Sequence, residues 1–288
     1  MMIRSMLCCF FGWLLLPMHL PLVAQEPDEK VEITSESLLP IHLESAKSYV
    51  ITSKGSPQAL VLREQPLFGW TNERRAGGQL GHVFLWMDGE RPAALAGIFS
   101  FPWGGKVTNR RVVHEMHALA PKKLNVIRDG RPGKWQPKSG LERRPIPAKV
   151  DAVSNANQMK FQLRRLARRF TGHCVDPDGK RWELRGLPQP LISYPIGEDG
   201  VGALIAMMGD VGSDLESGIL IECVGQEGGS ATTWSYAPIR MTDMETHLFF
   251  DGQPTWESVR TDTDTHLHDS NHVYFRFQDQ TVPMQLSN

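Results

Sequence analysis

The segment His114-Glu115-Met116-His117 carries the side chains best suited to chemistry in this chain. A His-Glu-x-x-His spacing on a helix would place two imidazoles on one face for zinc, but these histidines are three residues apart and their apolar neighbours favour a strand. Alternation along a strand sends Glu115 and His117 to one face, where they could bind a ligand, coordinate a metal or form an acid–base couple. The alternative, which we prefer, is a structural hydrogen-bonded pair.

A second candidate lies near the C-terminus, where Asp262, Asp264, His266 and His268 occupy alternate positions. If this stretch is extended, the four side chains project from one face, which is a spacing that can chelate a divalent cation. His266 and His268 are therefore candidate metal ligands. The alternative is a solvated polar loop close to the chain end.

Trp103 directly precedes Gly104-Gly105 and is expected in an exposed turn. Its indole suits stacking against a ligand, and packing within the loop is the alternative. Ser213 and Ser230 lack the Gly-x-Ser-x-Gly pattern of a nucleophile elbow, and Gly104-Gly105-Lys106 lacks the upstream glycine of a phosphate loop. The sequence therefore predicts no catalytic residue and no cofactor.

Residues 1–24 have the features of an export signal: Arg4, an apolar run from Met6 to Leu16, and a small residue, Ala24, at the expected cleavage point. Removing them takes one arginine from 31 basic residues, which leaves 30 against 32 acidic ones and a net charge of −2. This balance argues against a nucleic-acid partner. No later apolar run approaches the roughly 20 residues that span a bilayer. We therefore expect an exported protein, periplasmic or extracellular, without a transmembrane segment.

Two of the four cysteines, Cys174 and Cys223, lie beyond that segment. In an oxidising compartment a bridge between them would close a loop of roughly fifty residues and stabilise the fold by about 3–4 kcal/mol. Two separate buried thiols are the alternative.

Residues 155–172 show the strongest helical pattern. An apolar stripe recurs at helical spacing, Asn155 suits the N-cap, and Gly172 suits the left-handed residue after the last turn. The other faces carry five basic residues and no acidic one, namely Lys160, Arg164, Arg165, Arg168 and Arg169. We interpret them as a solvated face, with an anion or nucleic-acid patch as the alternative.

A weaker helical stripe begins at Leu39 and runs to Val50, and alternating segments joined by short turns follow it. Asp88-Gly89 and Asp129-Gly130 each separate two strand-like runs, which predicts antiparallel hairpins. Similar segments recur in the same order on both sides of the helix at 155–172, which favours a divergent duplication.

These patterns predict an α+β fold of tandem duplicated units, each with one helix packed on an antiparallel β meander. The expected organisation is a signal peptide at 1–24, a flexible leader at 25–37, a first unit at 38–137, a linker at 138–154, a second unit at 155–260 and a tail at 261–288.

Several segments resemble a family of uncharacterised exported bacterial proteins: Trp70-Thr71-Asn72, Val83 to Trp86, His114 to Leu119 and Leu187 to Leu191. The resemblance covers most of residues 45 to 260. Met116 and Ala118 stand where the family has an aromatic residue and a serine. The family has no assigned activity, so the resemblance implies compartment and architecture and transfers no catalytic residue.

No set of catalytic residues converges in the pattern, and both halves contain glycine-rich loops. We therefore expect a non-enzymatic scaffold that binds a ligand or a protein partner through its loops. The alternative function is a metal-dependent hydrolase that uses Glu115 and His117.

Overall fold

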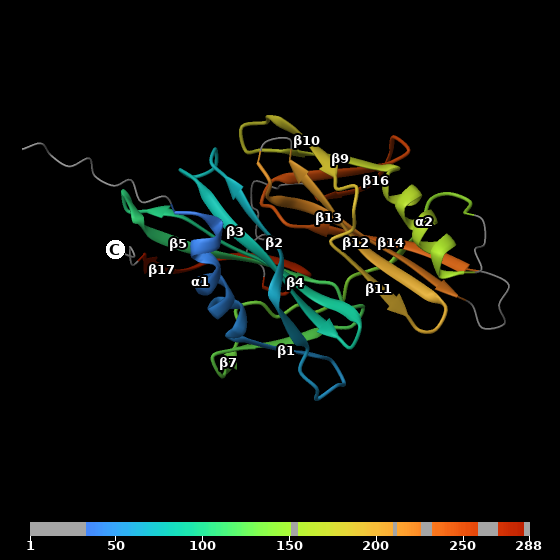
Figure 1. Ribbon diagram of the computed structural model, residues 1–288, viewed down its shortest axis with the longest axis horizontal. Coiled ribbons are helices and arrows are strands. Elements are labelled where there is room, and N and C mark those ends of the chain that lie inside the picture. The colour runs from blue at the N-terminus through green and yellow to red at the C-terminus, as the bar shows by residue number, and fades with distance from the viewer. Residues whose placement is uncertain (1–32, 151–154, 210–211, 226–231, 259–269, 285–288) are drawn as a thin grey trace, which may run out of the picture. The chain divides into compact units, whose positions relative to one another are not determined.

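Two antiparallel sheets packed face to face form most of the molecule (Figure 1). The computed structural model describes residues 33–150, 155–209, 212–225, 232–258 and 270–284. In the first sheet the strand order is β17 (Tyr274–Pro283), β5 (Lys106–Ala118), β4 (Arg91–Trp103), β3 (Gln79–Asp88) and β2 (Val61–Asn72).

The second sheet is larger, with nine strands among the described residues. Its strand order is β16 (Gln253–Ser258), β15 (Glu245–Phe250), β9 (Phe170–Val175), β10 (Arg181–Gly186), β12 (Gly200–Gly209), β13 (Leu215–Gly225), β14 (Thr232–Arg240) and β8 (Arg144–Pro145), with β11 (Ile192–Ile196) also paired to β12. A small third sheet contains β1 (Tyr49–Ser53), β6 (Leu124–Arg128) and β7 (Arg131–Pro132).

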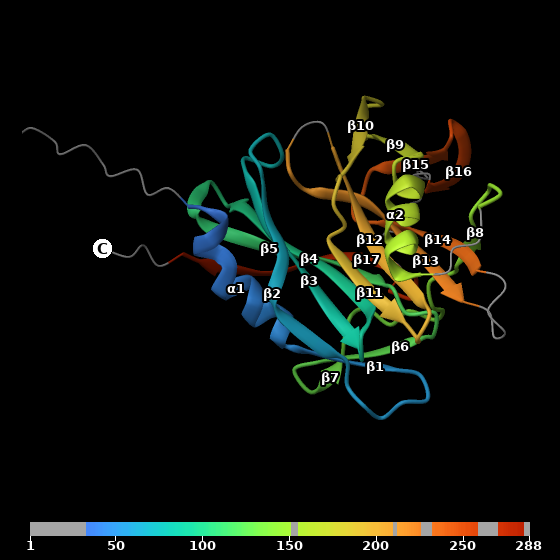
Figure 2. The same ribbon diagram turned by 45° about the vertical axis from the view of Figure 1, so that its right-hand side comes forward.

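One helix covers the outer face of each large sheet, so the layers run helix, sheet, sheet, helix (Figure 2). Helix α1 (Ser35–Lys47) lies on the first sheet and α2 (Ala156–Ala167) on the second. Strand β4 is buried along most of its length because the other sheet covers one of its faces and α1 covers the other. Alternation along β5 then turns Val113 and Glu115 toward the space between the sheets.

The interface under α1 is more polar than the sequence pattern predicted. The helix starts at Ser35, capped by Thr34, and ends before Val50, which belongs to β1. Its most buried side chains include His42, whose Nδ1 lies 2.9 Å from Nδ1 of His82 on β3. The stripe expected from Leu39 is displaced by one position, to Leu38, His42 and Ser45, which leaves Leu39 and Leu43 only partly buried.

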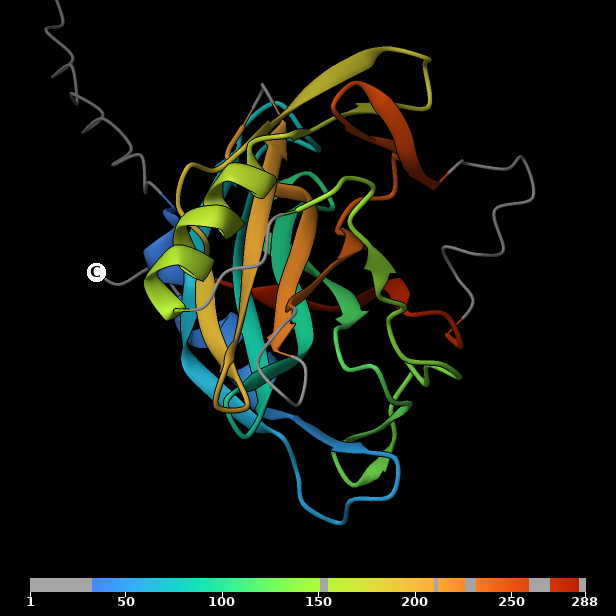
Figure 3. The same cartoon turned by 90° about the vertical axis from the view of Figure 1, so that its right-hand side faces the viewer.

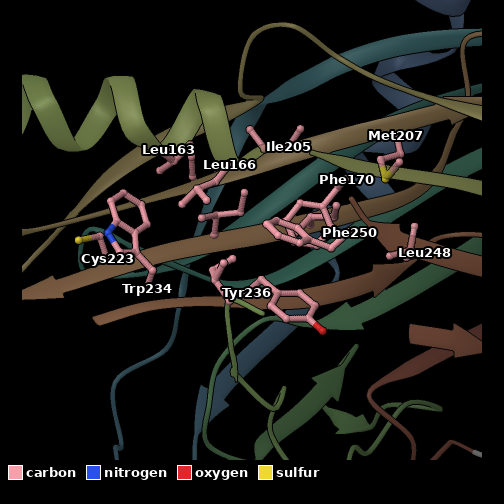
Figure 4. Packing of buried hydrophobic residues seen from close by; sticks show 14 of the residues in the cluster. Leu163, Leu166, Phe170, Ile205, Met207, Cys223, Trp234, Tyr236, Leu248 and Phe250 are labelled. Atoms are coloured by element: carbon pink, nitrogen blue, oxygen red, sulfur yellow. The ribbon is translucent and has the colours of Figure 1, made fainter. Parts of the chain in front are cut away.

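The cap of α2 was predicted correctly, since the side chain of Asn155 accepts a hydrogen bond from the Gln158 backbone N–H at 2.9 Å. The predicted helix end at Gly172 is wrong, because the helix ends at Ala167. Gly172 lies inside β9, where an added Cβ would stand 2.8 Å from the carbonyl oxygen of His247 on the next strand. Its role is therefore close strand packing and not helix termination. Beneath the helix, Leu163 and Leu166 pack on aromatic side chains of the second sheet (Figure 4).

Both predicted hairpins are present. Asp88 and Arg91 pair across the turn between β3 and β4, and Asp129-Gly130 joins β6 to β7. Asp129 and Gly130 both have positive φ, of 50° and 73°, which suits a tight turn between twisted strands.

The predicted α+β class with tandem helix-on-meander units is wrong. The described residues form a mostly β structure of seventeen strands and two helices, and neither predicted unit is self-contained. The tail supplies β17, which pairs with the open edge of β5, and the linker supplies β8, which pairs with β14. Strands from outside the unit boundaries are recruited because an unpaired sheet edge leaves backbone groups unsatisfied.

The predicted disulfide is also wrong: no bridge joins Cys174 and Cys223, which are both buried thiols. Two strands, β10 and β12, separate β9 from β13. Three strand spacings alone separate the two cysteines by at least about 14 Å, well beyond the roughly 7 Å limit for a disulfide. In the part of the chain that the structure describes, no helix is long and apolar enough to cross a bilayer.

The buried position of the two thiols predicts their reactivity. In the protein produced from residue 25, an aromatic disulfide reagent should modify neither cysteine in the native state, and burial also raises the pKa of Cys174 to about 12. Both should react after denaturation without reductant. Failure to titrate any thiol in denaturant would reveal a bridge and contradict the structure.

Candidate functional site

A cavity of about 400 Å³ opens at one end of the interface between the two sheets. The first sheet contributes Trp70 from β2, Phe99 from β4 and Glu115 from β5. The second contributes Glu216 from β13 and the segment around Asp243 after β14. Its walls therefore combine aromatic rings with acidic side chains from elements that are far apart in the sequence.

Glu216 is aimed at the cavity by a β-bulge. In the ladder between β12 and β13, Met207 pairs with Ser217 and Met208 pairs with Leu215, so Glu216 has no residue opposite it. A bulge of this kind bends the strand and redirects a side chain. The carboxylate is almost fully buried, and its Oε2 has no hydrogen-bond partner in the described part of the chain.

The loop after β2 brings Arg75 across to the second sheet. Ala76, Gly77 and Gly78 all have positive φ, which folds the loop tightly. The Arg75 guanidinium donates to Glu216 at 2.7 Å and to Asp214 at 3.2 Å, and it also reaches the sulfur of Met244 at 3.1 Å. Asn72 holds Asp214 from the same strand end through its amide nitrogen, at 3.0 Å from both carboxylate oxygens.

A second guanidinium, that of Arg276 on β17, organises the other side of the cavity. Arg276 and Glu115 are paired across the β17–β5 ladder, and Nε of Arg276 lies 3.4 Å from Oε1 of Glu115. Its Nη1 bonds to Asp243, and Tyr274 donates its hydroxyl to Glu115 at 3.1 Å. Each of these arginines therefore already binds two carboxylates.

The lining carries more acid than base. It includes three arginines, Arg74, Arg75 and Arg276, and the five carboxylates of Glu115, Asp176, Asp214, Glu216 and Asp243. This excess of two acidic groups is concentrated beside the aromatic and thioether walls formed by Trp70, Phe99, Trp182, Met241 and Met244.

Burial changes the ionisation of the two glutamates. Desolvation raises the pKa of Glu115 to about 7 against the opposing charge of Arg276, with a further increase from Asp243. Desolvation also raises the pKa of Glu216, to about 8, with Arg75 opposing and Asp214 adding to the shift. The two carboxyls of the cavity therefore hold protons near neutral pH that a bound cation would displace.

The two residues predicted to act together have separate partners. Glu115 lines the cavity, but His117 lies deeper on the same face, where its Nδ1 donates to the Ala118 carbonyl at 2.8 Å. Burial lowers the pKa of His117 to about 4, so the ring is neutral. The preferred hydrogen-bonded pair is not formed, because Glu115 bonds to Tyr274 and Arg276 instead.

The remaining candidates do not join this cavity. Trp103 is 43% exposed at the end of β4, where the guanidinium of Arg111 stacks 4.6 Å from its ring centre. His266 and His268 lie outside the described residues. Among the residues that are described, no group of three or more His, Cys, Asp or Glu is arranged to hold a metal ion.

Sequence reasoning missed most of the cavity. Glu216 is the one ionisable residue in the strand segment from Leu215 to Ile221, and an ionisable residue in such a largely apolar run signals either an ion pair or a site. Arg75 precedes a Gly-Gly loop, but nothing in the sequence shows that it crosses to a strand some 140 residues later. The site depends on long-range contacts that local patterns do not encode.

Comparisons with known proteins found no counterpart for this chain: no family model matches it, and neither does a curated protein or a solved structure. The cavity is therefore interpreted from its own geometry and chemistry.

Ionisation of Glu216 should weaken the fold at alkaline pH. Because its folded pKa lies above the ordinary value of 4.5, its contribution to stability is complete below pH 4.5 and is lost as pH rises through about 8. The free energy of unfolding of Glu216→Gln should therefore exceed that of the parent in mildly alkaline buffer, by on the order of 1–3 kcal/mol. This difference should disappear as the pH is lowered toward 4.5, the pKa of the unfolded side chain. Urea unfolding across this pH range measures the effect. A variant that is equally destabilised at every pH would contradict the assignment.

Proposed function

We propose that the protein is an exported, non-enzymatic binding protein whose cavity between the sheets takes a small organic cation, of the amine or guanidine class. The observation that carries the proposal is the surplus of carboxylates around the cavity, together with the unpartnered Oε2 of Glu216. An unsatisfied buried acceptor costs free energy that a ligand N–H donor would offset.

The charges of the cavity favour a cation over an anion. Arg75 and Arg276 are each engaged by two carboxylates, so neither is available to an incoming anion. An ammonium or guanidinium group would instead donate hydrogen bonds to the carboxylates of Glu216 and Glu115. Trp70 adds an aromatic ring of the kind that attracts organic cations by a cation–π interaction, whereas the ring of Trp182 already has the Lys180 ammonium 3.7 Å from its centre.

The size of the cavity sets an upper bound on the ligand. A volume of about 400 Å³ lies at the lower end of the range for small-molecule sites. At about 30 Å³ per water, it corresponds to roughly a dozen displaced waters. A single compact amine or guanidine fits this space, whereas a folded protein partner would contact only its rim.

The metal-dependent hydrolase is not favoured by the geometry. It requires Glu115 and His117 to act on one centre, but the imidazole is bound to a backbone carbonyl and does not line the cavity. The carboxylate is held by Tyr274 and Arg276.

Thermal unfolding with simple probes tests the proposal. Agmatine and cadaverine should raise the melting temperature by several degrees at saturating concentration, roughly 5–10 °C at 100 times Kd, whereas succinate and glucose should not. Binding should strengthen from acidic to mildly alkaline pH, because the two glutamates must ionise to receive the cation.

Two variants make the test specific to the cavity. Glu216→Gln should lose most of the amine-induced shift, measured against its own melting temperature. Glu142→Gln, which changes an exposed carboxylate, should retain it. Stabilisation by succinate or glucose and not by amines would contradict the proposal, as would an unchanged amine response in Glu216→Gln.

A further inference from the structure

Helix α2 presents a strongly basic face to solvent. Its buried stripe is formed by Met159, Leu163 and Leu166, and the helix lies along the outside of the second sheet (Figure 3). The opposite face carries four exposed cations at helical spacing, Lys160, Arg164, Arg165 and Arg168. At 1.5 Å per residue they form a stripe about 12 Å long.

These four cations are not neutralised by neighbours. None of them forms an ion pair with a carboxylate in the described part of the chain. Arg169, one residue further on, shows the contrast, because its guanidinium is held by Asp251 at 2.5 Å. The whole chain has a net charge of only −1, so positive charge is concentrated on this face and is not a general property of the surface.

An apolar group stands among the cations. Phe161 is 63% exposed, and the guanidinium of Arg165 lies 6.0 Å from its ring centre. Beside the helix runs a groove of about 230 Å³ in which Arg164 and Arg168 face Leu187, Pro188 and Ile205. A phenyl ring and an apolar groove next to unpaired cations match a partner that is both anionic and hydrocarbon-rich.

We propose that this face of α2 docks the protein on an anionic lipid bilayer, with Phe161 entering the interface and the four cations contacting lipid phosphates. A polyanion such as a nucleic acid would satisfy the cations but would leave Phe161 and the apolar side of the groove uncovered. The helix lies along the outside of the second sheet, where neither large sheet covers its outward face (Figure 3). This inference is independent of the ligand cavity, which lies between the sheets.

Vesicle cosedimentation tests the proposal on the protein produced from residue 25. Binding is expected to phosphatidylcholine vesicles that contain phosphatidylglycerol and not to phosphatidylcholine alone, and added salt should weaken it. Each cation near an anionic bilayer strengthens binding roughly fivefold. The double variant R164E/R168E should therefore weaken it by at least about 25-fold.

Two further variants separate this face from general charge effects. Phe161→Ser keeps every charge and should reduce vesicle binding several-fold, because it removes the group that enters the interface. K122E/K123E makes the same change in net charge at exposed residues of another segment and should bind like the parent. Unchanged melting temperatures would confirm that all variants are folded.

Three results would overturn the proposal. They are equal binding to neutral and anionic vesicles, equal loss in K122E/K123E, and binding to heparin or duplex DNA without any binding to vesicles. The last result would identify the same face as a site for a soluble polyanion.

Discussion

Two partly buried guanidiniums hold together the end of the sheet interface where the cavity lies. Arg75 reaches from the first sheet to Asp214 and Glu216 of the second, and Arg276 on β17 binds Glu115 and Asp243. Four carboxylates this close would repel one another if the arginines were absent. These contacts therefore close one end of the interface between the sheets and leave more carboxyl groups than guanidiniums around it.

This arrangement explains why the cavity persists in an otherwise well-packed interface. Apolar side chains from both sheets fill the centre, including Leu95 and Leu204, and charged groups replace them at the end. Breaking one arginine contact would leave a buried carboxylate without its partner, which is costly, so the network resists collapse. The proposed organic cation would supply a hydrogen-bond donor to Oε2 of Glu216, which has no partner among the residues that the structure describes.

The helix cap and the tight turns were predictable from the sequence, because they depend on residues close together in the chain. The cap at Asn155 and the turns at Asp88-Gly89 and Asp129-Gly130 follow from side-chain and backbone preferences within a few residues. The fold class was not predictable in this way, because the periodicity of two helices is conspicuous and many buried strands are not. Glu115 was identified by strand alternation, but its partners Tyr274 and Arg276 come from a tail strand about 160 residues away. Glu216 could be recognised as a cavity residue only once the β-bulge in the β12–β13 ladder was known.

The cavity holds two glutamates whose burial keeps them protonated near neutral pH and which a bound cation would ionise. Carbon-13 NMR of the glutamate side-chain carboxyls, titrated in the ligand-free protein and assigned with Glu115→Gln and Glu216→Gln, measures this directly. Desolvation predicts titration of Glu115 near 7 and of Glu216 near 8. Titration of both carboxyls close to 4.5, the value of an exposed glutamate, would contradict the account.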